Sequence, residues 1–216
     1  MCREMKDSGI EWIGEIPQHW NVKKHKYVMF KKKDICSKYE GEDILSLTMK
    51  GVIVRDLESP TGKMPASFDG YQRIYKDNLL LCLFDIDVTP RCVGVIKNDG
   101  LTSPAYSQFI MKDNNNSEYY NYLLTTIDDK KCFIHLSKNL RSSLTEDDFG
   151  VLKTIVPPVK EQEGIANYLD KKVCQIDDII LKQKNLIAKY KMYKQSLITE
   201  TVTKGLNNNI VMKNSG

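Results

Sequence analysis

The 216-residue sequence has no long hydrophobic run. No stretch approaches the roughly 18 apolar residues that a membrane-spanning helix needs. The segment from Met1 to Trp20 mixes charged and apolar residues throughout and lacks the apolar core of a signal peptide. We therefore expect a soluble, cytoplasmic protein without a membrane partner.

The sequence also lacks any Cys-x-x-Cys pair. Its six cysteines are scattered, and none of the three histidines has a cysteine partner at the spacing of a zinc finger. Without a secretion signal, scattered cysteines predict free thiols in a reducing compartment. We therefore expect neither disulfides nor a metal site.

Motifs that carry catalysis are missing too. No glycine-rich phosphate loop is present, which argues against a nucleotide-hydrolysing motor. The sequence contains neither a Gly-x-Gly-x-x-Gly fingerprint nor an Asn-Pro-Pro-Tyr type of motif, which argues against a base methyltransferase. It also has no Glu-x-Lys after a suitably spaced Asp, which argues against a restriction nuclease. We expect no catalytic residue and no cofactor.

Asp85 and Asp87 are the most tempting pair of carboxylates. They lie in a strand-like run, where alternate residues would project on one face. They could bind a metal ion, but a hydrogen-bonding or base-reading role fits the end of a loop better, because Asp can accept from cytosine N4.

Charge gives little indication of a partner. The net charge is +4, and residues 1–160 hold 23 basic and 22 acidic side chains. Any phosphate-binding face must therefore come from local segregation of charge. The basic run from Lys23 to Lys33 is more typical of a solvated face than of a DNA contact.

Residues 1–158 have the pattern of an α+β globular domain. Short runs rich in β-branched and aromatic residues predict strands at Ile44–Leu47, Gly51–Val54, Asn78–Phe84, Cys92–Ile96 and Tyr106–Met111. Helical spacing predicts a helix over Glu118–Thr126, and Thr145 with three following acidic residues predicts a capped helix start.

Residues 159–205 predict one long helix, followed by a flexible tail at 206–216. From Glu161 to Lys204 there is no proline and only one glycine, and Gly205 supplies a stop. Its heptad seam consists of Val173, Ile176, Ile180, Gln183, Ile187, Tyr190, Lys194 and Leu197, followed by Thr201. The helix would pack on its own domain or on another helix. Its length of about 65 Å and the polar seam residues favour a coiled coil with a specified partner.

Three segments resemble one protein family. They are GIEWIGEIPQHW (9–20), LLLCLFDIDVTPRCVGVIKNDGLTSPAY (79–106) and LRSSLTEDDFGVLKTIVPPVKEQEGIANYLDKK (140–172), and the end SLITETVTKGL (196–206) agrees with them. Together, and in this order, they resemble the specificity subunit of type I restriction-modification systems. The first segment predicts an apolar clasp made by Trp12, Ile13, Ile16 and Trp20 rather than a functional site.

The resemblance implies a target recognition domain followed by a conserved helical region. It implies sequence-specific binding of double-stranded DNA, with methylation and cleavage carried out by a methyltransferase subunit and a nuclease and translocase subunit. Family members usually carry two such halves in tandem, whereas this sequence has one and no internal repeat. A homodimer through the helix would restore the symmetry, and it would prefer an interrupted palindrome with half-sites at most about 19 base pairs apart.

Candidates for DNA contact are basic, aromatic or amide side chains in loop-like segments, although each could equally be an ordinary solvated group. They are Lys50, Arg55, Lys63, Tyr71, Gln72, Arg73, Arg91, Lys97, Asn98, Lys138, Asn139 and Arg141. Two other functions remain open: an autonomous DNA-binding regulator, and an interaction protein that blocks the methyltransferase. A self-contained DNA-modifying enzyme is the weakest alternative.

Overall fold

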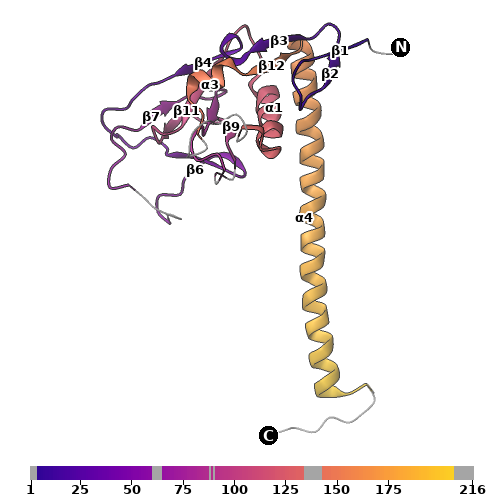
Figure 1. Cartoon of the computed structure of the whole chain (residues 1–216). Helices are drawn as coiled ribbons and strands as arrows, with labels where there is room; N and C mark the ends of the chain where they lie inside the picture. Colours follow the sequence, from indigo (N-terminus) through magenta and orange to yellow (C-terminus); the bar gives the residue numbers. More distant parts are fainter. Residues whose placement is uncertain (1–3, 60–64, 88, 90, 134–142, 207–216) are drawn as a thin grey trace. The chain divides into compact units, whose positions relative to one another are not determined.

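The structure is a computed structural model, and it describes residues 4–59, 65–87, 89, 91–133 and 143–206 (Figure 1). The chain forms two compact units, Met1–Ala166 and Asn167–Gly216. The first is a β-rich α+β domain, and the second consists of the remainder of one long helix. No helix in the described part of the chain is both long and apolar enough to cross a membrane.

A four-stranded antiparallel sheet forms the centre of the first unit. Its order is β4 (Met29–Lys32), β11 (Ser107–Met111), β8 (Leu79–Leu81) and β9 (Val93–Val95). The other strands pair antiparallel: β1 (Met5–Asp7) with β2 (Glu15–Pro17), β3 (Asn21–Lys24) with β12 (Lys153–Val156), β5 (Leu45–Thr48) with β6 (Gly51–Val54), and β7 (Gln72–Ile74) with β10 (Gly100–Thr102). The helices of this unit are the short η1 (His25–Tyr27), α1 (Ser117–Asp129) and α3 (Glu146–Val151).

The central sheet is buried on both faces, as the three successive leucines of β8 require. Leu79 and Leu81 lie in the main core with Tyr120 of α1 and Phe149 of α3. Leu80 instead joins a second cluster with residues of β5, β6 and β7. Side chains alternate along a strand, so one apolar run fills both cores.

Gly94 lets the β5–β6 hairpin approach the sheet closely. A Cβ at this position would lie 2.9 Å from Leu47 Cδ1 and 3.0 Å from Val52 Cγ2. Any larger residue would push the hairpin away from β9. This contact fixes the hairpin on the sheet.

The predicted strands are confirmed, because each of the five predicted runs corresponds to one observed strand. Gly51–Val54 has the predicted bounds, and the run Ile44–Leu47 is shifted by one residue to Leu45–Thr48. The other three strands are shorter than predicted, and the run Asn78–Phe84 is a strand only over Leu79–Leu81. The strand-like geometry expected for Asp85 and Asp87 is wrong. The chain bends after Leu83, and Asp85 has a φ of 47°, in the left-handed region.

The predicted helices and the capped start are also confirmed. The backbone N–H of Tyr119 donates to Asn116 Oδ1 at the start of α1 (2.8 Å). Thr145 begins α3 with a capping box, in which its hydroxyl accepts from the Asp148 N–H and Asp148 accepts from the Thr145 N–H. In the first turn of α3, carboxylates therefore accept a backbone hydrogen bond and also interact favourably with the positive end of the helix dipole.

The apolar clasp predicted around the N-terminal motif is present. Trp12, Ile13 and Trp20 pack against a buried cluster that contains Ile16. Ile155 of β12 is part of the same cluster. The N-terminal segment and the strand that precedes the long helix therefore share one small core.

The long helix α4 extends from Val159 to Lys204 without interruption, which agrees with the helix predicted over residues 159–205 to within one residue. Gly205, with a φ of 78°, follows its last residue, and its N–H donates to the Thr201 carbonyl. In the second unit the apolar seam residues are exposed, from 40% for Val173 to 64% for Tyr190. The residues Cys36, Cys82, Cys92, Cys132 and Cys174 are free cysteines, as predicted.

Candidate nucleic-acid interface

The β5–β6 hairpin presents an exposed tip above a well-packed base. Leu45, Leu47 and Val52 face the second core, whereas Met49 and Lys50 at the turn are exposed. The Thr48 hydroxyl accepts from the Lys50 N–H (3.1 Å) and donates to the Gly51 carbonyl (2.9 Å), so the tip is hydrogen-bonded internally. Gly51 has a φ of 90°, which a residue with a side chain would rarely adopt.

A groove lies beside this tip. It has a volume of about 230 Å³ and is lined by Leu47, Thr48, Met49, Cys82, Phe84, Thr89, Arg91 and Tyr106. We call it the hairpin groove. It brings together the hairpin, the segment between β8 and β9, and Tyr106 before β11, which are far apart in the sequence.

Aromatic rings and a guanidinium group define the chemistry of the hairpin groove. The rings of Phe84 and Tyr106 lie 6.0 Å apart between centroids, tilted by 30°. Arg91 donates from Nη1 to the Thr125 hydroxyl of α1 at 3.5 Å, and a guanidinium group carries five N–H donors in total. Arginine donors suit guanine edges and phosphates, and the apolar Met49 suits a thymine methyl group.

The groove is not suited to nucleophilic chemistry. Burial raises the pKa of the Cys82 thiol, which donates to the Phe84 carbonyl at 3.3 Å. Burial also raises the pKa of the Tyr106 hydroxyl. Both groups are therefore neutral at physiological pH, and neither is activated as a nucleophile.

The structure brings two of the predicted DNA-contacting residues to one region. Lys50 is at the hairpin tip, and Arg91 lines the hairpin groove. Arg55 follows β6, and its positive charge acts on the Tyr106 hydroxyl and lowers the pKa of that group, against the effect of burial. Lys50 and Arg91 therefore lie at the hairpin turn and in the hairpin groove, whereas Arg55 lies at the opposite end of the hairpin, where its N–H donates to the Ile44 carbonyl at 2.7 Å.

The other candidates lie elsewhere in the domain. Arg73 pairs with Glu42 at 3.3 Å, and Tyr71 packs its ring edge-on against Phe68. Lys97 forms an ion pair with Glu118 at the start of α1, and Asn98 is exposed next to it. Lys63, Lys138, Asn139 and Arg141 lie outside the described residues.

Gln72 is buried inside the domain rather than exposed in a loop. It is 1% exposed, and its amide donates to the carbonyls of Ser103 (3.0 Å) and Tyr106 (2.7 Å). In this position it supports the segment that carries Tyr106 instead of facing solvent. The sequence signal was misleading because Gln72 lies between Tyr71 and Arg73, which retain exposed surface.

Seven of the eight residues that line the groove were missed at the level of sequence: Leu47, Thr48, Met49, Cys82, Phe84, Thr89 and Tyr106. Met49 and Thr48 had a detectable signal, because they lie at the turn between two predicted strands. Phe84 and Tyr106 had none, because their proximity depends on the register of β8 with β11.

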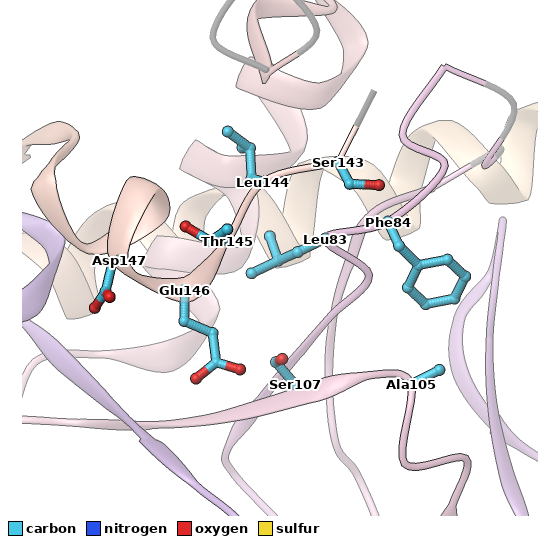
Figure 2. Close-up of a pocket in the computed structure, with 9 residues that line it drawn as sticks. All are labelled: Leu83, Phe84, Ala105, Ser107, Ser143, Leu144, Thr145, Glu146 and Asp147. Atoms are coloured by element: carbon cyan, nitrogen blue, oxygen red, sulfur yellow. The ribbon is translucent and has the colours of Figure 1, made fainter. Parts of the chain in front are cut away.

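A second cavity differs in character from the hairpin groove. It has a volume of about 440 Å³ between the end of β8, the start of β11 and the first turn of α3 (Figure 2). Figure 2 shows Glu146, Asp147, Ser107 and Ser143 around it, with Phe84 at the side. Its described lining contains no lysine or arginine, but Lys31 forms an ion pair with the lining residue Glu146.

Asp85 and Asp87 lie in the bend that follows Leu83. Among the described residues there is no group of three or more histidine, cysteine, aspartate or glutamate side chains able to hold a metal ion. The bend that contains them instead receives hydrogen bonds, because the Thr89 hydroxyl donates to the Asp85 carbonyl at 2.8 Å. A base-reading role for these two carboxylates remains a prediction.

An α+β domain joined to a long heptad-patterned helix is a combination that also occurs in solved structures. One chain comes from a study of complex assembly and conformational transition of the type I R-M system; it matches with a TM-score of 0.63 and 14% identity over 88% of this chain and 47% of that chain. The HsdS subunit from Thermoanaerobacter tengcongensis matches with a TM-score of 0.53 and 16% identity, over 94% of this chain and 48% of that one. No protein-family model and no curated protein matches the sequence.

This chain spans about half the length of the structures that it matches. It therefore has the fold of one half of a type I restriction-modification specificity subunit, as the sequence resemblance predicted.

Proposed function

We propose that the protein is a non-catalytic, sequence-specific DNA recognition subunit of a type I restriction-modification system. The observation that carries this proposal is the hairpin groove: an exposed two-stranded tip with Lys50, beside Arg91 and two aromatic rings. The fold shared with type I specificity subunits supports it.

In this proposal the β5–β6 hairpin enters the major groove of double-stranded DNA. A two-stranded β-ribbon fits the width of that groove. Arg91 reads a guanine edge, and Met49 contacts base carbons or a methyl group. Lys50 and Arg55 bind flanking phosphates, which set the position of the domain. Tyr71, Arg73, Lys97 and Asn98 are further candidates for contacts outside the hairpin and the hairpin groove.

We further propose that the half-length subunit acts as a homodimer that directs a methyltransferase subunit, and through it a nuclease and translocase subunit, in the cytoplasm. The exposed apolar seam of α4 supports a helical partner, since burying about 25 cal/mol per Å² of apolar surface favours association. A pair of identical subunits with two-fold symmetry prefers an interrupted palindrome.

Selection from a random DNA library tests the proposal. The full chain, alone and together with the methyltransferase subunit of its system, is incubated with the library, and bound DNA is sequenced. We expect enrichment of one interrupted palindrome, stronger with the methyltransferase. The absence of any enriched sequence in both conditions would overturn sequence recognition and favour an interaction protein. Equal, tight binding without the methyltransferase would favour an autonomous regulator.

A matched pair of variants ties the result to the hairpin groove. Arg91→Ala removes a groove donor, whereas Lys189→Ala removes a cation from the exposed surface of α4 outside the seam. We expect the first to change the enriched sequence and the second to leave it unchanged. Identical enrichment by both variants would exclude Arg91 as a reader.

A further inference from the structure

We propose that the domain carries a second nucleic-acid site, which binds a short unpaired single strand by stacking its bases on Tyr27 and Phe30 and by placing its phosphates on Lys26 and Lys112. We call these four residues the edge site. They lie at and beside β4, which is one edge of the central sheet, whereas the β5–β6 hairpin packs over β9 at the other edge. The edge site is therefore separate from the hairpin groove, and the proposal does not depend on duplex recognition there.

Two aromatic rings of the edge site are exposed. Tyr27, the last residue of η1, is 56% exposed, and Phe30 of β4 is 45% exposed. Neighbouring side chains of a strand point to opposite faces, so Phe30 projects away from the main core, in which Met29 is buried. Large apolar groups gathered on a surface are typical of a binding site, and both rings retain surface on which a planar group can stack.

Each of these rings is accompanied by a lysine. Lys26 Nζ lies 5.3 Å from the centroid of the Tyr27 ring, and Lys112 Nζ lies 5.8 Å from that of Phe30. Lys112 Nζ also donates to the Lys26 carbonyl at 2.8 Å, which joins the two pairs into one cluster. Neither lysine forms an ion pair with a described residue. Cations beside stacking platforms are the combination that binds single strands, because the rings take bases and the ammonium groups take phosphates.

Positive charge continues along β3, the strand that leads into η1. Lys24 of β3 stands directly opposite Lys153 of β12, and both side chains are exposed. Like charges in directly opposite positions destabilise a sheet. Among the described residues neither lysine has an ion-pair partner to offset this cost. A bound anion would offset it, so this pair extends the edge site toward further phosphates of the same strand.

A cavity between β4, η1 and α3 lies beside the edge site. It has a volume of about 240 Å³, and Phe30 lines it together with the buried rings of Phe109 and Phe149. An apolar cavity of about 150 Å³ holds benzene, so this one has room for the ring of a single base. The carboxylates of Glu146 and Asp147 also line it, and they favour an uncharged base over a phosphate. The phosphates then remain outside, on the lysines.

The combination of rings and cations favours a single strand over other anionic partners. In a duplex the bases stack on one another and are not available to a ring on the protein surface. An acidic protein would pair with the lysines but would leave Tyr27 and Phe30 without planar partners. An unpaired strand uses both kinds of group, and it does so with little sequence preference because every base has a π-face.

Binding of a labelled oligothymidylate of about 12 nucleotides to the full chain tests the proposal. Oligothymidylate stays single-stranded, and its affinity is measured by fluorescence anisotropy at several salt concentrations. We expect Tyr27→Ala and Phe30→Ala each to weaken binding by roughly tenfold, because each removes a stacking platform. Lys26→Ala and Lys112→Ala should each reduce the slope of log K against log salt by about 0.7. All four side chains retain exposed surface, and circular dichroism verifies that the variants are folded.

The matched control is a pair of the same kind on α4. Lys172 Nζ lies 5.9 Å from the centroid of the Tyr168 ring, which is 62% exposed. Tyr168→Ala and Lys172→Ala should bind oligothymidylate like the wild type. The proposal is overturned if the wild type does not bind oligothymidylate at low salt, or if Tyr168→Ala weakens binding as much as Tyr27→Ala.

Two further outcomes separate the edge site from other surfaces. If only the lysine variants weaken binding, the surface recognises negative charge alone, and an unpaired strand is not its ligand. Arg91→Ala, in the hairpin groove, should leave oligothymidylate affinity unchanged while it alters duplex selection. An equal loss of oligothymidylate affinity in Arg91→Ala and Phe30→Ala would show that the two sites are one, which also overturns the proposal. Failure of oligothymidylate binding with intact duplex selection would leave the duplex function standing.

Discussion

The indole Nε1 of Trp20 donates a hydrogen bond to Glu161 Oε2 at 2.9 Å, across 141 residues of sequence. The other oxygen of the same carboxylate accepts from His19 Nε2 at 2.6 Å. Two motifs that were recognised separately in the sequence are therefore joined by one side chain. Glu161 holds the N-terminal clasp against the first turn of α4, in addition to complementing the helix dipole.

Replacing Glu161 should destabilise the domain. Glu161→Ala removes the acceptor for both Trp20 and His19, and the partly buried indole N–H loses its partner. We expect a loss of about 1–2 kcal/mol in the free energy of unfolding. Urea denaturation followed by tryptophan fluorescence measures it, and Glu163→Ala, an exposed carboxylate in the same turn, is the control. Equal stability of the two variants would contradict a structural role for the Trp20 contact.

The neighbouring Gln162 should matter more, because it is fully buried and uses both ends of its amide. Its oxygen accepts from the Asn116 N–H, and its nitrogen donates to Asn115 Oδ1 and to the Pro157 carbonyl, each at 2.8 Å. Gln162→Ala leaves these groups unpaired, and we expect a loss of about 2–4 kcal/mol. Denaturation of this variant is compared with that of Gln175→Ala, an exposed glutamine of α4. A loss no larger than that of the control would contradict this assignment.

Buried His25 should make the domain sensitive to acid. Its ring stacks on Phe149 at 4.4 Å between centroids, and its Nδ1 donates to the Phe149 carbonyl at 3.2 Å. Burial lowers the pKa of His25 from 6.5 to about 4. The unfolded chain therefore binds a proton at a higher pH than the folded chain. Stability is complete above pH 6.5 and decreases as the pH falls toward 4, by about 3 kcal/mol in total.

The decisive measurement is the difference between wild type and His25→Gln as a function of pH. Glutamine cannot titrate, so the variant should lose the part of the pH dependence that lies between pH 6.5 and 4. Gln175→Ala, at an exposed residue of α4 that does not titrate, should retain the wild-type dependence on pH in this range. Parallel stability curves for wild type and His25→Gln would show that His25 does not titrate in this way.

Local patterns predicted the helices α1, α3 and α4 and five of the described strands. The capping box at Thr145, the period of α4 and the alternation within β5 and β6 depend on residues close in sequence. The short strands β1, β2, β3, β4, β7, β10 and β12 were not predicted. Each has three or four residues, and each exists because of its pairing partner rather than its own composition.

The candidate site was less predictable for the same reason. Lys50 and Arg91 were recognised as loop cations, but their proximity depends on how the hairpin packs over Gly94. Gln72 and the bend at Asp85 were misread, because burial and backbone direction there are set by tertiary contacts. Residue type identified candidates, whereas the register of the sheet determined which of them meet.

The two cations of the hairpin should have separable effects on DNA binding. Lys50→Ala removes a phosphate contact, so affinity should fall for all sequences to a similar degree, and the slope of log K against log salt should decrease by about 1. Arg91→Ala removes a base contact, so it should cost roughly 1–3 kcal/mol on the target and much less on unrelated DNA. Fluorescence anisotropy at several salt concentrations, with target and scrambled duplexes, distinguishes the two effects.

Lys76→Ala provides the control for both variants, because Lys76 is an exposed cation of the same domain that does not line the hairpin groove. It should change neither the salt slope nor the ratio of target to scrambled affinity. If Lys76→Ala reproduced the effect of Lys50→Ala, the phosphate contact would be a property of the whole basic surface. If Arg91→Ala weakened both duplexes equally, Arg91 would be a phosphate contact, and base reading would have to come from the hairpin tip itself.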